Sequence, residues 1–324
     1  MKIVIPGGTG QIGQILRRNL DAEGHELVIL SRSGQPDGGP GRIVPWDACA
    51  SGAWTAEFNG ADVVINLAGR SVNCRYTPAN RKAILQSRVQ STEAVAQAIS
   101  RAKHPPALWL QSSTATLYGH RFDAPNDENS GWIHPNAEGY RSSWEFSVQV
   151  AEAWEKAAHS SPTPRTRKVF LRSAMTMSCD PGGVFDVLLG LVRRGLGGTN
   201  GSGRQFVSWI HENDFVEALR WILAHDRLEG PVNIAAPAPL PNRDFMKALR
   251  HAWGTPLGLP ATEWMLEFGA LFLRTETELI LKSRRVIPGR LLESGFTFQF
   301  PDWPTAAAEL CARLRNNRQT ATAT

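Results

Sequence analysis

The chain has 324 residues, of which 42% are hydrophobic and 20% charged, so it can bury a large core in one elaborated domain or in two unequal domains. The net charge of +5 is mild and no block of Lys and Arg stands out, which makes nucleic acid a weak hypothesis and suits an anionic cofactor. No apolar run approaches the roughly 18 residues of a membrane span, the N-terminus reads as a strand and not a signal peptide, and four scattered cysteines without a C-x-x-C pair indicate a reduced, cytoplasmic protein.

A glycine-rich turn follows the first apolar segment, residues 3–5. Gly7, Gly10 and Gly13 have G-x-x-G-x-x-G spacing, and a helical pattern over residues 14–22 comes directly behind them. Such glycines let the backbone approach a pyrophosphate, whose charge then faces free N–H groups and the positive end of the helix. An ordinary strand-to-helix turn is the alternative. The pattern predicts a dinucleotide cradle that also includes the intervening residues Thr9, Gln11 and Ile12.

The end of the second predicted strand, residues 26–31, decides which dinucleotide is expected. An NAD site usually has an acid there for the ribose hydroxyls, whereas a 2′-phosphate requires a base. This chain has Ser31 and Arg32, with no carboxylate before Asp37. The Arg32 fork can clamp a 2′-phosphate and Ser31 can donate to it, so we expect NADP(H) in preference to NAD(H). The alternative is that Arg32 is only a solvated loop residue.

Three further positions are assigned to the cofactor. Asp47 follows a short strand at 43–45 and can accept from the adenine amino group, although capping its own loop is an equal alternative. The apolar strand at 61–69 ends in small residues that let a ribose or diphosphate pass close to the backbone. Arg88 lies one turn into a helix expected over 83–101. The strand-end residues in this set are Leu67, Ala68 and Gly69.

Strands and helices continue to alternate through residue 172, which predicts an α/β fold with a Rossmann-type doubly wound parallel sheet. We assign residues 1–236 to the NADP-binding domain, with 181–205 as a lid or substrate insertion. Residues 237–324 form a smaller, mainly helical substrate-side domain. Its expected core comprises Trp264, Leu266, Phe268, Leu271 and Phe272.

Motifs spread along the chain resemble extended short-chain dehydrogenase/reductases of the epimerase/dehydratase class. They are Gly7–Gly13, Asn66–Gly69, Ser112–Gly119, Leu171–Arg172 and Trp209–Asp214. Further motifs at 195–198, 201–205, 284–288 and 295–298 narrow the resemblance to the atypical "epimerase family protein" subgroup, short-chain dehydrogenase/reductase family 39U, with its C-terminal domain of unknown function. The resemblance implies an NADP-binding fold and says little about the reaction.

The catalytic residues depart from the pattern of that superfamily, in which a Ser or Thr holds the substrate oxygen and a Tyr passes its proton. A Lys four residues later lowers the phenol pKa. Thr114 fills the Ser/Thr position by motif register, but Tyr76, Tyr118 and Tyr140 all lack the following Lys. Glu145 falls near the Tyr position, and it is a candidate acid/base if burial raises its pKa. The alternative is an exposed helical glutamate; Tyr118 is a second candidate.

Two residues further along are candidate substrate contacts. Arg204 follows a glycine-rich loop, and His211 comes directly after a predicted strand at 206–210. His211 is equally well explained as a hydrogen-bonded residue that braces the following helix, whose expected N-cap is Asp214. No metal site is expected, because H-E-x-x-H is absent and the histidines lack neighbouring ligands.

The favoured hypothesis is reversible hydride transfer between the nicotinamide and a small carbonyl or alcohol. Thr114 orients the oxygen, and Glu145, Tyr118 or a water handles the proton. A non-catalytic NADP(H) sensor or scaffold is the alternative, and a nucleotide-sugar epimerase or dehydratase ranks third. The expected partner is a small-molecule substrate, with neither nucleic acid nor membrane. Homodimerisation through the helices at 83–101 and 143–159 is left open.

Overall fold

The structure, a computed structural model, describes residues 1–133, 144–265 and 277–322. The chain forms two compact units, and each is assembled from three segments. Unit 1 contains residues 1–117, 145–173 and 219–232, and unit 2 contains residues 118–144, 174–218 and 233–324. Unit 2 therefore includes two segments that precede the expected division at residue 236. A sequence pattern read in chain order does not show such returns of the chain.

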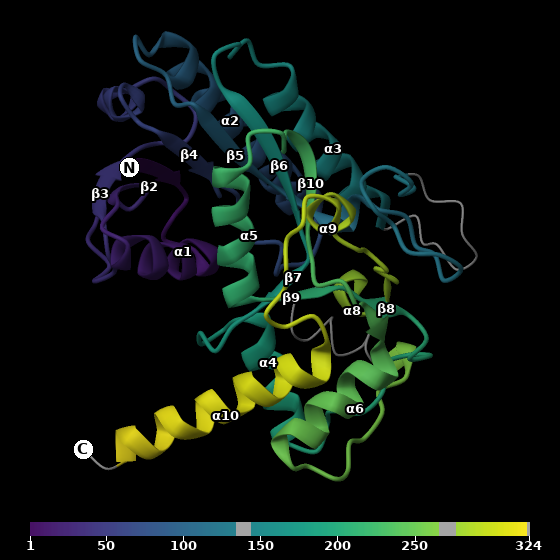
Figure 1. Ribbon diagram of the computed structural model, residues 1–324. Coiled ribbons are helices and arrows are strands. Elements are labelled where there is room, and N and C mark those ends of the chain that lie inside the picture. The colour runs from purple at the N-terminus through teal and green to yellow at the C-terminus, as the bar shows by residue number, and fades with distance from the viewer. Residues whose placement is uncertain (134–143, 266–276, 323–324) are drawn as a thin grey trace. The chain divides into compact units, whose positions relative to one another are not determined.

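Unit 1 is built on a seven-stranded sheet with the order β10-β6-β5-β4-β1-β2-β3 (Figure 1). The ladders from β6 across to β3 are parallel, which confirms the doubly wound α/β prediction. The strands are β1 (Lys2–Pro6), β2 (Glu26–Ser31), β3 (Arg42–Pro45), β4 (Val63–Asn66), β5 (Leu108–Thr114), β6 (Arg167–Ser173) and β10 (Gly230–Ile234).

Helices cover this sheet and explain why its central strands are apolar throughout. They are α1 (Gln11–Ala22), α2 (Pro78–Arg101) and α3 (Glu145–His159), with short 3-10 turns η1 (Ala53–Phe58) and η2 (Ala115–Leu117). α2 packs along α3. A parallel sheet covered on both faces buries both sides of its strands, so Val4, Val64 and Trp109 are all fully buried.

The start of α2 differs from the sequence prediction, which placed it at residue 83. The helix begins at Pro78, because Thr77 is a side-chain N-cap that accepts a hydrogen bond from the Asn80 N–H at 3.3 Å. Proline is tolerated in the first turn, where its missing N–H has no helical partner to lose. Residues 78–82 therefore belong to the first turn of the helix, which begins five residues before the predicted start at 83.

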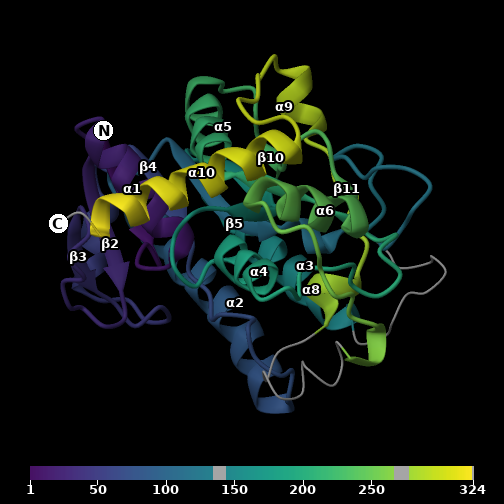
Figure 2. The ribbon, with the colours of Figure 1, turned by 90° about the horizontal axis from the view of Figure 1, so that it is seen from below.

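Unit 2 contains short strands and several helices. β7 (Met175–Met177) pairs in parallel with β9 (Trp209–His211), and β8 (Phe206–Val207) pairs antiparallel with β11 (Leu240–Pro241). Helix α10 packs against α6 (Figures 1 and 2). The helices are α4 (Val184–Arg193), α6 (Asn242–Trp253), α8 (Glu278–Leu281), α9 (Gly289–Glu293) and α10 (Trp303–Thr322), and α5 (Glu212–Ala224) begins here and ends in unit 1.

The core of unit 2 is not the one expected. Trp209, Phe245 and Trp303 are fully buried, and the rings of Phe245 and Trp303 stack with centroids 4.1 Å apart. Trp264, by contrast, is 71% exposed, so its assignment to the core was wrong. The other members of that predicted core, Leu266, Phe268, Leu271 and Phe272, lie outside the described residues.

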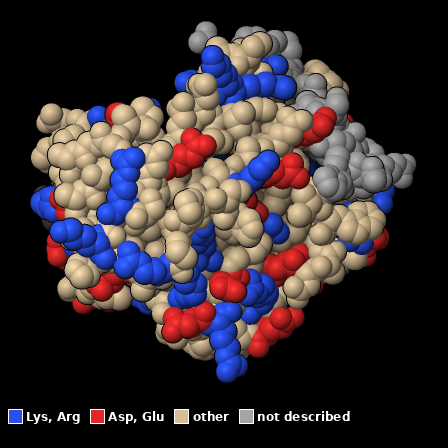
Figure 3. All heavy atoms as spheres, turned by 90° about the horizontal axis from the view of Figure 1, so that it is seen from above, with Lys and Arg blue, Asp and Glu red and all other residues tan. Residues whose placement is uncertain are grey.

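Two surface properties bear on partners. Among the described helices, none combines the length and the hydropathy needed to cross a membrane. On the face that Figure 3 shows, Lys and Arg side chains are interspersed with Asp and Glu side chains.

Candidate cofactor and active site

In the glycine-rich turn between β1 and α1, two glycines are closely packed against the backbone and a third has free space beside it. Gly7 has a φ of +75°, and a Cβ there would lie 2.7 Å from the Ala68 Cα. A Cβ on Gly13 would lie 2.2 Å from the Gly8 carbonyl oxygen, whereas one on Gly10 would meet its nearest atom at 3.6 Å. Gly7 and Gly13 are thus required by the packing of the turn, and Gly10 is the exposed position that a ligand can approach.

The first turn of α1 is suited to an anion. Gly10 is its N-cap, with extended backbone and no side chain to cap the helix. The N–H groups of a first turn have no carbonyl partner within their own helix, and they form its positive end. The residues that carry these donors are the predicted Gln11, Ile12 and Gly13, and Thr9 is exposed beside them. This is a cradle of the kind that holds a pyrophosphate.

A buried polar network holds the segment after β4, which includes the predicted Leu67, Ala68 and Gly69. The Asn66 Oδ1 accepts from the Ala68 N–H at 3.1 Å, and the Asn66 amide donates to Gln111 Oε1 at 2.9 Å. The Thr92 hydroxyl accepts from the Trp154 indole at 3.1 Å and is also in contact with the Asn66 amide. Gln111, Thr92 and Trp154 were not identified from the sequence, because polar residues inside helices and strands show no local signal of their shared network.

Arg88 of α2 is half-buried beside that segment. Its Nη1 donates to the Arg70 carbonyl at 2.9 Å, and its guanidinium carbon lies 4.9 Å from the centroid of the Trp154 ring. Burial lowers its pKa to about 10. A Cβ on the neighbouring Gly69 would approach Arg88 to 3.2 Å. The structure therefore places Arg88 next to a predicted cofactor residue, and its contact with the cofactor stays a prediction.

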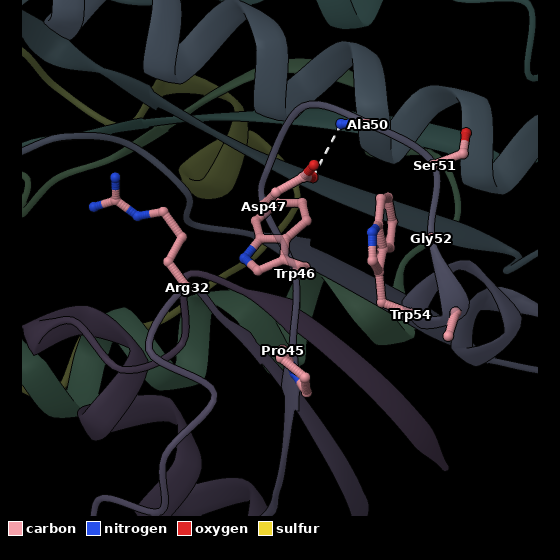
Figure 4. A pocket seen from close by; sticks show the side chains of 9 residues that line it. Arg32, Pro45, Trp46, Asp47, Ala50, Ser51, Gly52 and Trp54 are labelled. Atoms are coloured by element: carbon pink, nitrogen blue, oxygen red, sulfur yellow. Dashed lines mark hydrogen bonds between the residues drawn. The ribbon is translucent and has the colours of Figure 1, made fainter.

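Arg32 lies at the rim of an open pocket of about 480 Å³ beyond the end of β2 (Figure 4). Trp46 and Asp47 lie between Arg32 and Trp54 in this view. Arg32 is exposed, and its guanidinium has no ion-pair or hydrogen-bond partner among the described residues. The hydroxyl of the neighbouring Ser31 is 3.1 Å from that of Ser33. A free cation beside an aromatic wall fits a phosphorylated adenosine.

The carboxylate nearest in sequence, Asp37, is engaged elsewhere. Arg17 of α1 donates to both of its oxygens, at 2.7 and 2.8 Å, and to the Pro40 carbonyl at 2.5 Å. The Arg17 side chain is fully buried, and its hydrogen bonds lower the Asp37 pKa to about 2. Asp37 is therefore held by α1, and the sequence did not indicate this pair.

Asp47 caps its own loop, which is one of its two expected roles. Its Oδ1 accepts from the N–H groups of Cys49 and Ala50, at 3.1 and 3.0 Å, and these bonds lower its pKa. The second of them is drawn in Figure 4. The same side chain lines the pocket next to Arg32, so the contact with an adenine amino group stays a prediction.

Thr114 ends β5, at the carboxyl edge of the sheet where ligands of such folds bind. Its hydroxyl accepts from the Thr116 N–H at 3.2 Å. This bond uses a lone pair and leaves the hydroxyl proton for another acceptor. The preceding residue, Ser113, donates to Glu155 at 2.5 Å, and Arg172 clamps the same carboxylate at 2.9 and 2.8 Å. This trio, in which Ser113 and Arg172 are buried and Glu155 is partly buried, was also not predicted, and it anchors the end of β5 to α3 and β6.

The two candidate proton donors have different surroundings. Glu145, at the start of α3, is exposed and accepts a hydrogen bond from Gln149 at 3.2 Å. This is the arrangement of the alternative reading, a solvated helical glutamate. Tyr118, in unit 2, is 2% exposed, and its hydroxyl donates to Asn233 Oδ1 at 2.9 Å. A catalytic role for either residue stays a prediction.

The candidate substrate residues of unit 2 also differ from one another. Arg204 is exposed, with its guanidinium carbon 5.6 Å from the Phe122 ring. His211 is fully buried: Nδ1 accepts from the Asn213 N–H at 3.1 Å, which leaves Nε2, 2.9 Å from Glu309, to carry the proton. Burial lowers the His211 pKa to about 4. Both ring nitrogens thus contact the protein itself, as the bracing alternative requires.

In the described part of the chain, no three His, Cys, Asp or Glu side chains gather closely enough to bind a metal ion. The four cysteines are free thiols, and burial raises the pKa values of Cys179 and Cys311 to about 11. A buried thiol of that kind is a poor nucleophile.

Comparisons with known proteins extend over nearly the whole chain. Residues 3–235 match the NAD dependent epimerase/dehydratase family, and residues 261–310 match a domain of unknown function, DUF1731. The human epimerase family protein SDR39U1 is 32% identical over 315 residues, which cover 96% of this chain and 100% of that protein. The epimerase family protein YfhF of Bacillus subtilis (strain 168) is 30% identical over 314 residues, covering 96% and 98%. A crystal structure of human SDR39U1 (isoform 2) with NADPH superposes with a TM-score of 0.82, covering 96% of this chain and 99% of that one.

Proposed function

Because the chain belongs to the NAD dependent epimerase/dehydratase family, we propose that it binds NADP(H) in unit 1 and transfers hydride between the nicotinamide and a small carbonyl or alcohol. The preference for the 2′-phosphate is supported by the unpartnered Arg32 at the rim of its pocket and by the engagement of Asp37 with Arg17. The NADPH in the human relative, 32% identical, is consistent with the same cofactor here.

The residues of the cradle fit this cofactor. The first turn of α1 would hold the pyrophosphate, Arg32 and Ser31 would hold the 2′-phosphate, and the segment 67–69 would border the ribose. The cofactor supplies or accepts a hydride at its nicotinamide C4. The residues of the chain have two tasks in this reaction: they orient the substrate oxygen and they transfer one proton to or from it.

The observation that carries the reaction is the hydrogen bonding of Thr114. Because the hydroxyl oxygen accepts from the Thr116 N–H through one lone pair, the hydroxyl proton stays available for an outside acceptor, such as a substrate carbonyl oxygen. Glu145, Tyr118 or a water then exchanges the proton of that oxygen. We favour a water, because the Tyr118 hydroxyl already donates to Asn233 and Glu145 faces bulk solvent.

The test has two stages. NADPH and NADH are titrated into the purified protein by fluorescence, and NADPH oxidation is then followed against a panel of small aldehydes, ketones and quinones. With a substrate found, Thr114→Val is expected to lower kcat/KM by about a hundredfold, since one positioned hydroxyl is worth roughly 3 kcal/mol in a transition state. Full turnover by that variant would refute the role of Thr114.

A specific observation favours the second candidate, a non-catalytic NADP(H) sensor or scaffold. The Tyr-x-x-x-Lys pair is missing from the sequence, and both substitute proton donors have the surroundings of ordinary structural residues. Tight NADPH binding without oxidation of any compound in the panel would support the sensor. A nucleotide-sugar epimerase or dehydratase ranks below both, because chemistry through a keto intermediate requires a competent proton-transfer residue on each face of the substrate.

A further inference from the structure

Exposed leucines gather where two segments of unit 2 pair with each other. Leu196, Leu257 and Leu259 are 46%, 79% and 67% exposed. The Leu259 N–H donates to the Gly195 carbonyl at 2.7 Å, and the Leu259 carbonyl accepts from the Gly198 N–H at 3.1 Å, so the two segments run side by side. Single exposed apolar residues are common on protein surfaces, whereas a group of them on paired segments marks a surface for interaction.

The backbone of the two segments is closely packed. Gly195 follows the C-cap of α4 with a φ of +75°, and the Leu196 N–H donates back to the Leu191 carbonyl at 2.9 Å, as in a Schellman motif. A Cβ on Gly198 would lie 2.4 Å from the Leu259 carbonyl. The leucines are therefore carried by a packed pair of segments and not by a loose loop.

The exposed side of α4 continues this apolar surface. An open hollow of about 520 Å³ runs along the helix, and Val187, Leu191 and Arg194 are among the residues that line it. Residues three and four positions apart lie on one face of a helix, so these three side chains follow one another along α4. The acid of the hollow, Asp186, already accepts a backbone N–H at 2.9 Å. The apolar strip thus leads from Val187 to Leu196 and ends at a cation.

The sequence that forms this surface is basic. Residues 187–211 and 245–262 contain no Asp or Glu. They contribute Arg194 and Arg250, and helix α10 contributes Arg315. In the described part of the chain, no carboxylate lies within ion-pair distance of these three guanidinium groups. Their charge is therefore available to an anionic partner.

The cations lie together beside the leucine segments. The Arg250 Nη1 donates to the Gly197 carbonyl at 2.6 Å, which ties α6 to the segment that carries the first leucine. The guanidinium carbons of Arg193 and Arg315 lie 4.4 and 4.7 Å from the centroid of the Trp253 ring, at the end of α6. Helix α6 packs against both α4 and α10 (Figure 2). Arginines from three helices thus border one apolar patch.

We propose that this leucine–arginine face binds the surface of an anionic lipid bilayer. The face comprises Leu196, Leu257 and Leu259 together with Arg194, Arg250 and Arg315. The leucines enter the boundary between headgroups and acyl chains, and the guanidinium groups stay at the level of the lipid phosphates.

The shape of the face favours a bilayer over a protein partner. A helical partner docks its apolar side into a groove, whereas Leu257 and Leu259 protrude from the surface. Binding of this kind differs from spanning the bilayer, which none of the described helices can do. The proposal departs from the expectation that no membrane takes part, which was based on the lack of a spanning segment. It does not depend on hydride transfer.

The test is sedimentation of the full-length protein with lipid vesicles. Vesicles of phosphatidylcholine alone are compared with vesicles that also contain phosphatidylserine. We expect binding to the second kind only, and its loss at raised salt, because salt screens the lipid charge. Leu257→Ser should weaken binding by about tenfold, since it removes most of one buried apolar side chain. Arg194→Gln should weaken it by about fivefold, the contribution of one basic residue near such a surface.

Two matched controls are Leu292→Ser, an exposed leucine of α9, and Arg243→Gln, an exposed arginine at the start of α6 whose charge is paired. Both should bind vesicles as the parent chain does, and thermal melts verify that every variant folds. Sedimentation with neither kind of vesicle, or equally with both, would overturn the proposal. Equal losses for Leu257→Ser and Leu292→Ser would do the same.

Other occupants of the face give different results. Self-association that Leu257→Ser abolishes, without vesicle binding, would assign the face to a second copy of the chain. Binding of soluble polyglutamate that Arg194→Gln weakens, again without vesicle binding, would assign it to an acidic protein. Either result would overturn the bilayer proposal.

Discussion

Arg17 and Asp37 form a two-bond ion pair that joins helix α1 to the loop after β2. The guanidinium is fully buried while the carboxylate is 26% exposed, and the two N···O distances are 2.7 and 2.8 Å. Asp37 is the first carboxylate after β2 and could otherwise hydrogen-bond a ribose hydroxyl, but this pair engages it. The same loop begins with Arg32, so the pair also holds the chain that follows this proposed 2′-phosphate contact.

This pair predicts how stability depends on pH. The folded-state pKa of Asp37 is lowered from 3.8 to about 2, so its contribution is complete above pH 4 and is lost as the pH falls toward 2. Asp37→Asn should lower the free energy of unfolding by about 1 kcal/mol at pH 6, since solvent partly screens the acid. Urea unfolding at pH 6, 4 and 3 should show this difference shrinking. Asp21→Asn, which removes an exposed acid of helix α1, is the control, and a difference independent of pH would contradict the assignment.

The role of Arg32 predicts a change in cofactor preference. Arg32→Ser should weaken NADPH binding by about tenfold or more and leave NADH binding nearly unchanged, because only NADPH carries the 2′-phosphate. Fluorescence titrations of both cofactors measure the two constants. Lys103→Gln, which removes an exposed cation of the same unit, should change neither. Equal losses for NADPH and NADH would mean that Arg32 is only a general electrostatic contact.

Substitutions of two glycines in the cradle should distinguish an effect on stability from an effect on NADPH binding. Gly13→Ala puts a methyl group 2.2 Å from the Gly8 carbonyl oxygen and should cost about 3 kcal/mol, or roughly 8 °C in Tm. Gly10→Ala meets its nearest atom at 3.6 Å, so its Tm should stay within about 3 °C. That methyl group would instead lie where the backbone approaches the pyrophosphate, and NADPH affinity should fall. Unchanged NADPH binding by Gly10→Ala would place the pyrophosphate elsewhere.

Local sequence patterns were sufficient for the sheet and for the glycine-rich turn between β1 and α1. These signals are local: each of the apolar strands, the glycine spacing and the base after β2 can be recognised within a few residues. Repeated alternation of strands and helices then leaves few possible topologies. Contacts between distant residues were not accessible in this way. Arg17 has the position of a buried residue on an amphipathic helix, and nothing near it in sequence shows that Asp37, twenty residues later, returns to neutralise it.

Asp214 illustrates the same limit. A short acidic residue before an apolar run predicted an N-cap, but α5 begins at Glu212 and includes Asp214 in its first turn. The carboxylate accepts from the N–H groups of Gln299 and Phe300 instead, at 2.8 and 2.9 Å. The capping prediction was wrong because the competing donors come from a segment 85 residues away. The candidate proton donors show a different limit. Glu145 and Tyr118 were chosen from their positions in the sequence motifs, and such positions do not predict the burial or the hydrogen-bond partners of a side chain.

His211 gives the sharpest choice between a structural and a substrate-binding role. Burial lowers its pKa from 6.5 to about 4, so between these values the unfolded chain binds a proton that the folded chain does not. Stability should therefore fall as the pH drops from 6.5 to 4, by about 3 kcal/mol from this residue. His211→Gln keeps an amide that can donate to Glu309 but does not titrate, and it should flatten this dependence in urea unfolding. His104→Gln, an exposed histidine, should not. If His211→Gln instead raised KM for a substrate and left the pH dependence of unfolding unchanged, His211 would be a substrate contact and not a brace.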